Sequence, residues 1–191
     1  VVILDNYSYI SLTTSNAILH PARLYGLFSD WKPGDIFQRP PCFYEDWNDF
    51  SSEILFACDN EFEEVKRKIG VDAQVLPSLM NHYDSETPCQ LTDKMRSIDA
   101  FKGIEAAMKK NTDGYIPDFS NRYFTEDIPF GLLFLKKVAY LFSCETPTID
   151  KILLWAGSNM NQEFITADGH VICREEALKN KDTFLKFYGL S

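Results

Sequence analysis

The sequence lacks the short glycine-rich motifs that cradle phosphate groups. Its nine glycines are scattered, and none forms a G-x-G-x-x-G or a G-x-x-x-x-G-K pattern. The first pattern marks the turn that binds a dinucleotide, and the second marks the loop that binds a nucleoside triphosphate. No H-E-x-x-H or G-x-S-x-G pattern occurs either, so common protease and hydrolase signatures are missing. The 191 residues therefore show no cofactor site of their own.

Paired cysteines, long apolar runs and basic stripes are missing as well. The five cysteines form no C-x-x-C pair, so free thiols in a reducing cytoplasm are a simpler interpretation than disulfides or a zinc site. No apolar run reaches the roughly 18 residues that a membrane span needs, so we expect no membrane partner. A net charge of −9 without a basic stripe argues against binding to nucleic acid.

The composition does provide enough apolar side chain for one compact domain. Hydrophobic residues make up 45% of the chain and aromatic residues 14%, which predicts a bulky core or a cleft that stacks on a flat ligand. The chain does not begin with methionine, and Val1 to Asp5 read like a strand or a linker. We therefore expect a fragment of a longer protein.

Apolar side chains recur at intervals of three and four along most of the sequence, which is the pattern of helices packed on one face. Strand signals are few, so we predict a mostly α-helical single domain, residues 1–191, with about seven to eight helices. A turn is expected at 167–169, a loop at 111–121, and two short helices at the end of the chain. The longer helices are expected over 48–70, 91–109, 125–142 and 146–160, and a short helix over 76–83.

The first stretch with chemical potential is Asn16-Ala-Ile-Leu-His20-Pro21. Histidine titrates near neutrality and can pass a proton to a developing alkoxide or amine. A lone histidine in an apolar segment is more often a packed core residue, however. Since a residue before proline is disfavoured in the α conformation, we expect His20 at a helix end or a kink.

The second stretch is Arg122-Tyr-Phe-Thr125-Glu126-Asp127-Ile-Pro. Helix capping alone would explain its acids, with Thr125 as the N-cap and both carboxylates in the first turn. Arg122 would then simply pair with one of them. Alternatively, Asp127 fixes the tautomer of a histidine from another helix, and Arg122 holds a substrate carboxylate through two parallel hydrogen bonds.

The order and spacing of these stretches resemble the C-terminal domain of the octopine/nopaline (opine) dehydrogenase family. The resemblance extends over roughly residues 16–164. Each segment is modest alone, and their order makes the match fairly specific. The segments that carry it are Asn16-x-x-x-His20-Pro21, Phe43-Tyr44-Glu45, Met95 to Gly103, Arg122 to Leu132 and Cys144 to Asp150.

The resemblance implies a helical fold like the C-terminal domain of 6-phosphogluconate dehydrogenase. It also implies a reaction in which an amino acid condenses with an α-keto acid such as pyruvate, and NAD or NADP reduces the imine. His20 would be the general acid/base, Asp127 its partner and Arg122 the clamp on the keto acid. Asn16 would position substrate or nicotinamide, and Trp47, in the loop from Trp31, would contact the amino acid.

The resemblance also places the cofactor mainly on an N-terminal Rossmann domain that this sequence does not contain. The 191 residues alone should therefore be catalytically silent, since hydride transfer needs a nicotinamide held against the substrate. The choice between NAD and NADP, the two substrates and a homodimer stay open.

Two other functions compete with an opine dehydrogenase. One is the helical domain of another keto- or hydroxy-acid reductase, whose cleft would have no room for an amino acid. The other is a helical binding or dimerisation module without catalysis. In such a module, His20 and Asp127 should lie far apart.

Overall fold

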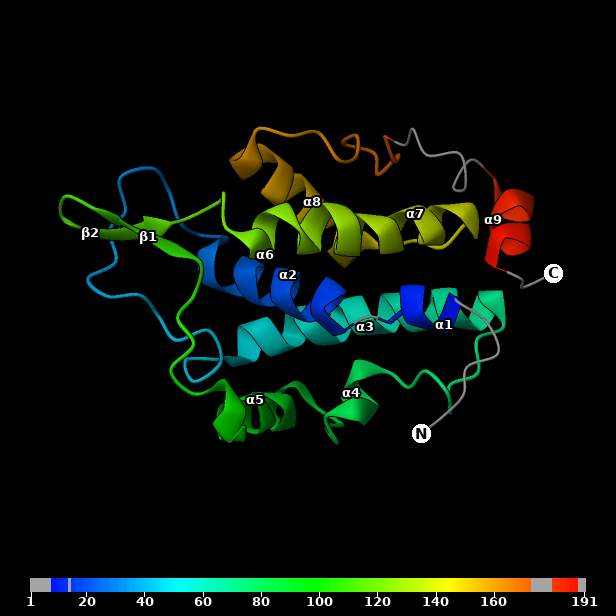
Figure 1. Cartoon of the computed structure of the whole chain (residues 1–191), viewed down its shortest axis with the longest axis horizontal. Coiled ribbons are helices and arrows are strands. Elements are labelled where there is room, and N and C mark those ends of the chain that lie inside the picture. Colours follow the sequence, from blue (N-terminus) through cyan, green and yellow to red (C-terminus); the bar gives the residue numbers. More distant parts are fainter. Residues whose placement is uncertain (1–7, 14, 173–179, 189–191) are drawn as a thin grey trace.

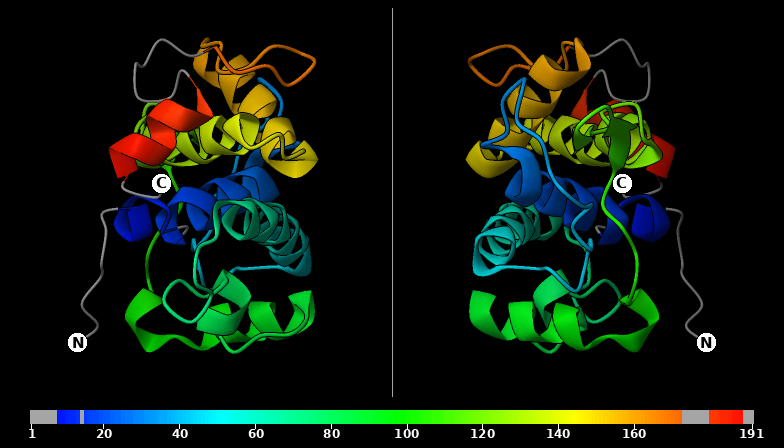
Figure 2. Two further views of the ribbon diagram at one scale, coloured as in Figure 1. Left: turned by 90° about the vertical axis from the view of Figure 1, so that its right-hand side faces the viewer. Right: turned by 90° about the vertical axis from the view of Figure 1, so that its left-hand side faces the viewer.

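The computed structural model describes residues 8–13, 15–172 and 180–188, and most of them are helical, as the sequence predicts. The longer helices form three layers (Figures 1 and 2). The middle layer contains α2 (Ser15–Phe28) and α3 (Asp49–Ile69), with α4 (Leu79–His82) and α5 (Pro88–Ser97) on one side and α7 (Leu133–Leu141) and α8 (Pro147–Met160) on the other. The remaining elements are α1 (Ser8–Ser11), the 3₁₀-helix Asp99–Phe101, β1 (Met108–Asn111), β2 (Gly114–Pro117), α6 (Arg122–Thr125), the π-helix Asp127–Leu132 and α9 (Lys181–Tyr188).

Helix α2 is the central element, and small residues let its neighbours approach closely. A Cβ atom on Gly26 would lie 2.2 Å from the Oγ atom of Ser51 on α3. A Cβ atom on Gly131 of the π-helix would lie 3.0 Å from the Cα atom of Ala17. Two glycines therefore fix how near α2 lies to the helices on either side of it.

The ends of α3 follow the sequence prediction. The side chain of Asn48 accepts a hydrogen bond from the backbone N–H of Ser51, which satisfies a donor that the first turn leaves unpaired. Gly70 ends the helix in the left-handed region, with φ of 86°. The helix expected over 48–70 is confirmed.

The helix expected over 91–109 is wrong in its second half. Helix α5 ends at Ser97, and the backbone of Ile104 and Ala106 instead pairs with that of Phe43 and Pro41. Pairing with a distant loop thus wins over local helical periodicity. The segment then enters an antiparallel hairpin in which Met108 faces Pro117, so the loop expected over 111–121 is partly β-structure.

The helix expected from Thr125 begins earlier and has a different cap. Asn121 accepts the capping hydrogen bond from Tyr123 N–H, and Thr125 is the last residue of α6, so the Thr125 cap is wrong. Pro129 lies in the following π-helix, where it has no N–H to donate. The helix widens there before α7 continues.

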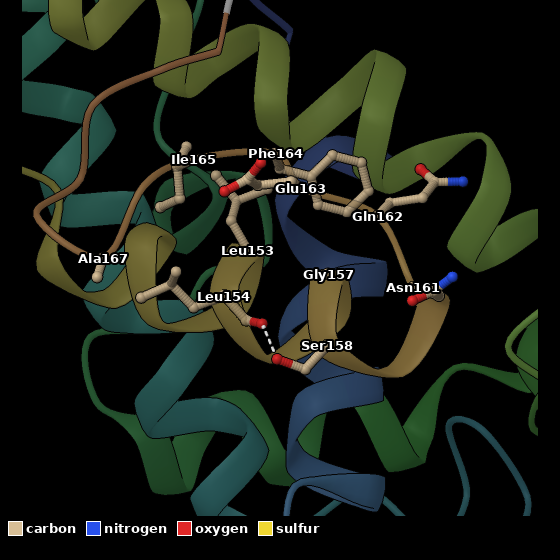
Figure 3. A pocket seen from close by; sticks show the side chains of 10 residues that line it. All are labelled: Leu153, Leu154, Gly157, Ser158, Asn161, Gln162, Glu163, Phe164, Ile165 and Ala167. Carbon is tan, nitrogen blue, oxygen red and sulfur yellow. Dashed lines mark hydrogen bonds between the residues drawn. The ribbon is translucent and has the colours of Figure 1, made fainter.

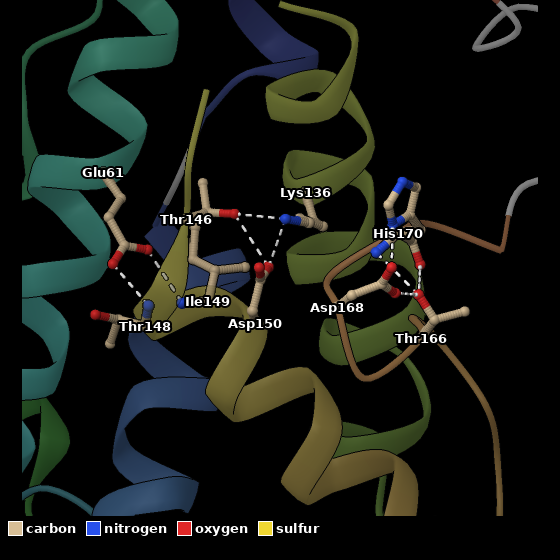
Figure 4. Close-up of polar contacts among 9 residues, drawn as sticks. All are labelled: Glu61, Lys136, Thr146, Thr148, Ile149, Asp150, Thr166, Asp168 and His170. Carbon is tan, nitrogen blue, oxygen red and sulfur yellow. Dashed lines mark hydrogen bonds and ion pairs between the residues drawn. The ribbon is translucent and has the colours of Figure 1, made fainter. Parts of the chain in front are cut away.

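The start of α8 lies where the sequence predicts it, with Thr146 at the N-cap and Pro147 in the first turn. The capping hydrogen bonds come from elsewhere, because the Glu61 carboxylate on α3 accepts from the N–H groups of Thr148 and Ile149 (Figure 4). Thr146 is held by Lys136 and Asp150, which also pair with each other at 2.6 Å. These polar contacts attach α8 to α3 and α7.

The remaining predictions concern the two ends of the chain. The turn at 167–169 is confirmed, with Gly169 at φ of 81°. The strand or linker expected at Val1–Asp5 lies outside the described residues, as does part of the segment expected to form the closing helices. In the part of the chain that is described, no helix combines the length and the apolar character that crossing a membrane requires.

Candidate active site

His20 lies inside α2, buried except for 7% of its surface. Helix α2 continues through Pro21 to Phe28, so of the two expectations for His20, a helix end or a kink, the helix end is wrong. Contacts with α3 and the π-helix hold α2 along this length and compensate for the hydrogen bond that proline removes. The ring is thus fixed in the middle of the central helix.

The Nδ1 atom of His20 lies 2.8 Å from Oδ2 of Asp127. Asp127 is the first residue of the π-helix, which packs against α2. The carboxylate keeps 22% of its side-chain surface exposed, whereas the imidazole is 9% exposed. The two stretches that the sequence singles out therefore meet in one contact, as the sequence-based hypothesis of a His–Asp pair requires.

The second ring nitrogen of His20 also has a partner. Nε2 lies 3.1 Å from the hydroxyl of Tyr44, a residue of the loop between α2 and α3 that is 6% exposed. An ionised Asp127 accepts from Nδ1–H, which leaves Nε2 to accept the Tyr44 O–H when the ring is neutral. Asp127, His20 and Tyr44 thus form a hydrogen-bonded chain across three segments.

Aromatic rings enclose this chain. The Tyr123 ring lies against the His20 ring with centroids 4.5 Å apart, and Phe43 meets it edge-on at 5.5 Å. Burial, aided by the neighbouring Tyr123 and Tyr83 and to a smaller extent by Asp127, raises the pKa of Tyr44 far above its usual value. The Tyr44 hydroxyl is therefore neutral throughout the physiological range and is available as both donor and acceptor.

Arg23, one turn after His20 on α2, holds the loop that carries Tyr44. Its guanidinium is fully buried and donates to the carbonyl oxygens of Phe43 and Asp46, each at 2.7 Å, and to that of Cys42 at 3.3 Å. A further hydrogen bond reaches Ser51 Oγ at 3.0 Å. Burial lowers the pKa of Arg23 to about 10, which still leaves it charged at neutral pH.

The other predicted site residues lie outside this chain of hydrogen bonds. Arg122 is exposed and its Nε lies 3.7 Å from Glu126, the simple ion pair that the sequence left open. Asn16 is exposed, one turn before His20 on α2. Trp47, which was expected to contact the amino acid, is fully buried among the described residues. It stacks on Tyr44 at 6.1 Å instead, because Arg23 and Ser52 hold it in the core.

Tyr44 and Arg23 are the residues that sequence reasoning missed. Tyr44 entered only as part of a similar segment, and nothing in the local sequence places its hydroxyl on a histidine 24 positions earlier. Arg23 had a usable signal, because a lone charge three residues after His20 interrupts an otherwise apolar helix. A charge in that position predicts a buried partner on the same side of the helix.

Two cavities lie away from His20 and Asp127. A hollow of about 430 Å³ at the C-terminal end of α8 is lined by residues such as Leu153, Gly157 and Phe164 (Figure 3). Another, of about 350 Å³, adjoins Lys136, Asp150 and His170. Neither has His20 or Asp127 in its lining. No group of side chains within the described ranges has the composition of a metal site, and Cys42, Cys58, Cys89 and Cys144 are free thiols.

Comparison with known proteins identifies the domain. Residues 3–160 match the family model described as NAD/NADP octopine/nopaline dehydrogenase, alpha-helical domain. The tauropine dehydrogenase of Arabella iricolor is 34% identical over 170 residues, which cover 82% of this chain and 42% of that protein. The octopine dehydrogenase of Pecten maximus is 29% identical over 87% of this chain and 44% of its own length.

Solved structures agree with the sequence matches. A structure of octopine dehydrogenase with NADH and pyruvate superposes with a TM-score of 0.78 at 28% identity, covering 92% of this chain and 47% of that one. A structure of the enzyme with NADH and L-arginine gives 0.74 at 29% identity, over 87% of this chain and 44% of that one. The chain thus spans less than half the length of the relatives it matches.

Proposed function

Because the chain belongs to the octopine/nopaline dehydrogenase family, as its α-helical domain, we propose that it is the substrate-binding and catalytic part of an opine dehydrogenase. The enzyme would join the amine of an amino acid to an α-keto acid such as pyruvate and reduce the resulting imine to a secondary amine, a reaction at a CH–NH bond. The observation that carries this proposal is the 2.8 Å contact between His20 and Asp127.

The contact provides what acid–base chemistry needs. Asp127 orients the imidazole and stabilises its charged form, so His20 can give a proton and later take one back. Formation of the imine expels water, and the carbonyl oxygen must gain protons before it leaves. We assign that proton transfer to His20. A binding or dimerisation module has no need of this pair, and the proximity of the two residues argues against it.

Arg122 is the proposed clamp for the keto-acid carboxylate. Its side chain is 75% exposed, and an exposed ion pair such as that with Glu126 contributes little free energy. A substrate carboxylate can therefore replace Glu126 and accept two parallel hydrogen bonds from the planar guanidinium. Asn16, exposed one turn before His20, is proposed to contact the amino acid or the nicotinamide.

The described residues do not fit the nucleotide half of NAD or NADP. Their only strands form an antiparallel pair, and no glycine-rich turn leads from a strand into a helix. We propose that a part of the protein outside these 191 residues binds the dinucleotide, which supplies the hydride. The free thiols are compatible with the cytoplasmic location that we propose.

A test with the full-length protein that contains this chain separates the proposal from a simple reductase. NADH or NADPH oxidation should require pyruvate and an amino acid together, and the product should have the mass of both substrates minus water plus two hydrogens. Oxidation with the keto acid alone, yielding a hydroxy acid, would point to a different reductase. Absence of turnover with a complete panel of amino acids and keto acids would reject the proposal.

A further inference from the structure

We propose that Tyr44 is a positioning residue for catalysis, acting through His20, whose Nε2 atom it holds from the side opposite Asp127. The inference rests on the proposed function, since it assumes that His20 transfers protons. The contact itself is a 3.1 Å hydrogen bond between two buried side chains, Tyr44 and His20.

The contact matters because it involves Nε2 of His20. Asp127 occupies Nδ1, so His20 can exchange a proton with a substrate only through Nε2. The Tyr44 hydroxyl is hydrogen-bonded to that atom, so a substrate must either take its place or exchange the proton through it. It therefore fixes the plane of the ring and the direction of the Nε2 lone pair before a substrate arrives.

A hydroxyl suits both protonation states of an acid–base catalyst. It donates to Nε2 when the ring is neutral, and it accepts from Nε2–H when the ring is charged. Only the phenolic proton has to rotate between the two states. An amide or ammonium group in this place would favour one state over the other, and a carboxylate would hold the proton on Nε2.

The structure holds the tyrosine itself on several sides. Its ring stacks on Phe101 with centroids 4.1 Å apart and on Trp47 at 6.1 Å. The carbonyl oxygens on either side of it, those of Phe43 and Asp46, accept from the buried Arg23. Burying the charged guanidinium of Arg23 costs free energy, and its hydrogen bonds to these carbonyl oxygens offset that cost only while the loop keeps this geometry. Helix α2 thus positions His20 directly and Tyr44 through Arg23.

The titratable groups in contact with the ring are Asp127 on the π-helix, Tyr44 on the loop and Tyr123 on α6. Arg23 follows one turn later on α2. Among these, only Tyr44 forms a hydrogen bond with Nε2, and its hydroxyl can act as donor or acceptor. A hydrogen bond to a charged ring is roughly twice as strong as one to a neutral ring. Removing the hydroxyl should therefore disfavour the charged ring.

The test is Tyr44→Phe in the full-length protein, compared with Tyr25→Phe. Tyr25 is a matched control because it lies on α2, the helix of His20, and is about as buried as Tyr44, at 8% against 6% exposure. Its ring packs on Trp155. In Tyr44→Phe, kcat should fall about 3- to 10-fold, the effect of one hydrogen bond, while KM for both substrates changes less than about twofold. The limb of the kcat–pH profile that depends on the histidine should move to lower pH by roughly half a unit to one unit. Tyr25→Phe should change neither.

The outcomes separate this inference from the proposed function. If His20→Gln is inactive but Tyr44→Phe keeps the wild-type kcat and pH profile, the role of Tyr44 is rejected and the proposed function stands. A lower kcat with an unmoved pH profile would also reject it, because loosened packing alone would give that result. If His20→Gln keeps full activity, the proposed function fails first. Equal thermal unfolding midpoints for the two tyrosine variants would show that loss of folding does not cause the difference.

Discussion

The imidazole of His20 and the carboxylate of Asp127 share a 2.8 Å hydrogen bond although 107 positions separate them in the sequence. One belongs to the central helix α2, and the other begins the π-helix that packs against it. The pair exists because Gly131, four residues after Asp127, lets the π-helix approach the backbone of Ala17 on α2. Close packing of two helices thereby creates the geometry of an acid–base pair.

Replacing either member of the pair should lower turnover sharply in the full-length enzyme. His20→Gln and Asp127→Asn should each reduce kcat by roughly 10²- to 10⁴-fold, the usual scale for acid–base groups. The double variant should be little worse than the worse single one, because the two side chains act as a unit. Glu53→Gln, an exposed carboxylate on α3, is the control and should stay near wild type. Steady-state kinetics in which the two losses multiply would show that the residues act separately.

Arg122→Lys should mainly weaken binding of the keto acid. Lysine keeps the charge but loses the planar fork, so two directed hydrogen bonds become one point contact. The expected loss is on the order of 1.5–3 kcal/mol in kcat/KM for pyruvate, the range for hydrogen bonds to charged groups. Arg67→Lys is a close control, since the side chain of Arg67 is 72% exposed against 75% for Arg122 and also pairs with a glutamate close to it in sequence. Equal pyruvate kinetics in the two variants would remove Arg122 from the site.

Two carboxylates on α3, those of Asp59 and Glu64, should contribute to the free energy of unfolding with opposite pH dependences. Burial raises the pKa of Asp59, so the folded state binds its proton more tightly than the unfolded state does. The stability that Asp59 contributes is therefore full below an ordinary value of about 4 and is lost as pH rises through its raised pKa. In urea unfolding, the free energy of unfolding of Asp59→Asn relative to wild type should be more favourable at pH 7 than at pH 4.

Glu64 provides the comparison of opposite sign. The hydrogen bond from Arg67 lowers the pKa of Glu64, so its stabilising contribution is present above the ordinary glutamate value and is lost as pH falls. The free energy of unfolding of Glu64→Gln relative to wild type should therefore be more favourable at low pH than at neutral pH. If the stability difference from wild type changed with pH in the same direction for both variants, burial of Asp59 would not explain its pH dependence.

The 191-residue chain by itself should bind NADH and NADPH weakly or not at all. The reason is the missing glycine-rich turn, without which no row of backbone N–H groups converges on the pyrophosphate. Isothermal titration calorimetry with both cofactors measures this directly. A dissociation constant in the micromolar range for either one would contradict the expectation.

Local sequence determined the helices whose signals were complete. The periodic apolar residues of α3, with Asn48 before them and Gly70 after them, predict a helix with the observed bounds. Thr146 and Pro147 likewise mark the start of α8. In these segments every local preference agrees with the packing, so neighbouring residues alone contain enough information. The stretches around His20 and Asp127 could also be singled out, since polar groups in apolar surroundings stand out in a sequence.

The tertiary structure decided what depends on distant segments. Residues 104–106 satisfy their backbone hydrogen bonds on the loop at 41–43 and leave the helix that their periodicity favours. Trp47 is buried because Arg23 and Ser52 bind it in the core, and no local pattern separates such a tryptophan from one that lines a cleft. The hydroxyl of Tyr44 reaches His20 only because the buried Arg23 holds its loop against α2. Sequence identifies residues able to do chemistry, but the distances between them arise from packing of elements that are far apart along the chain.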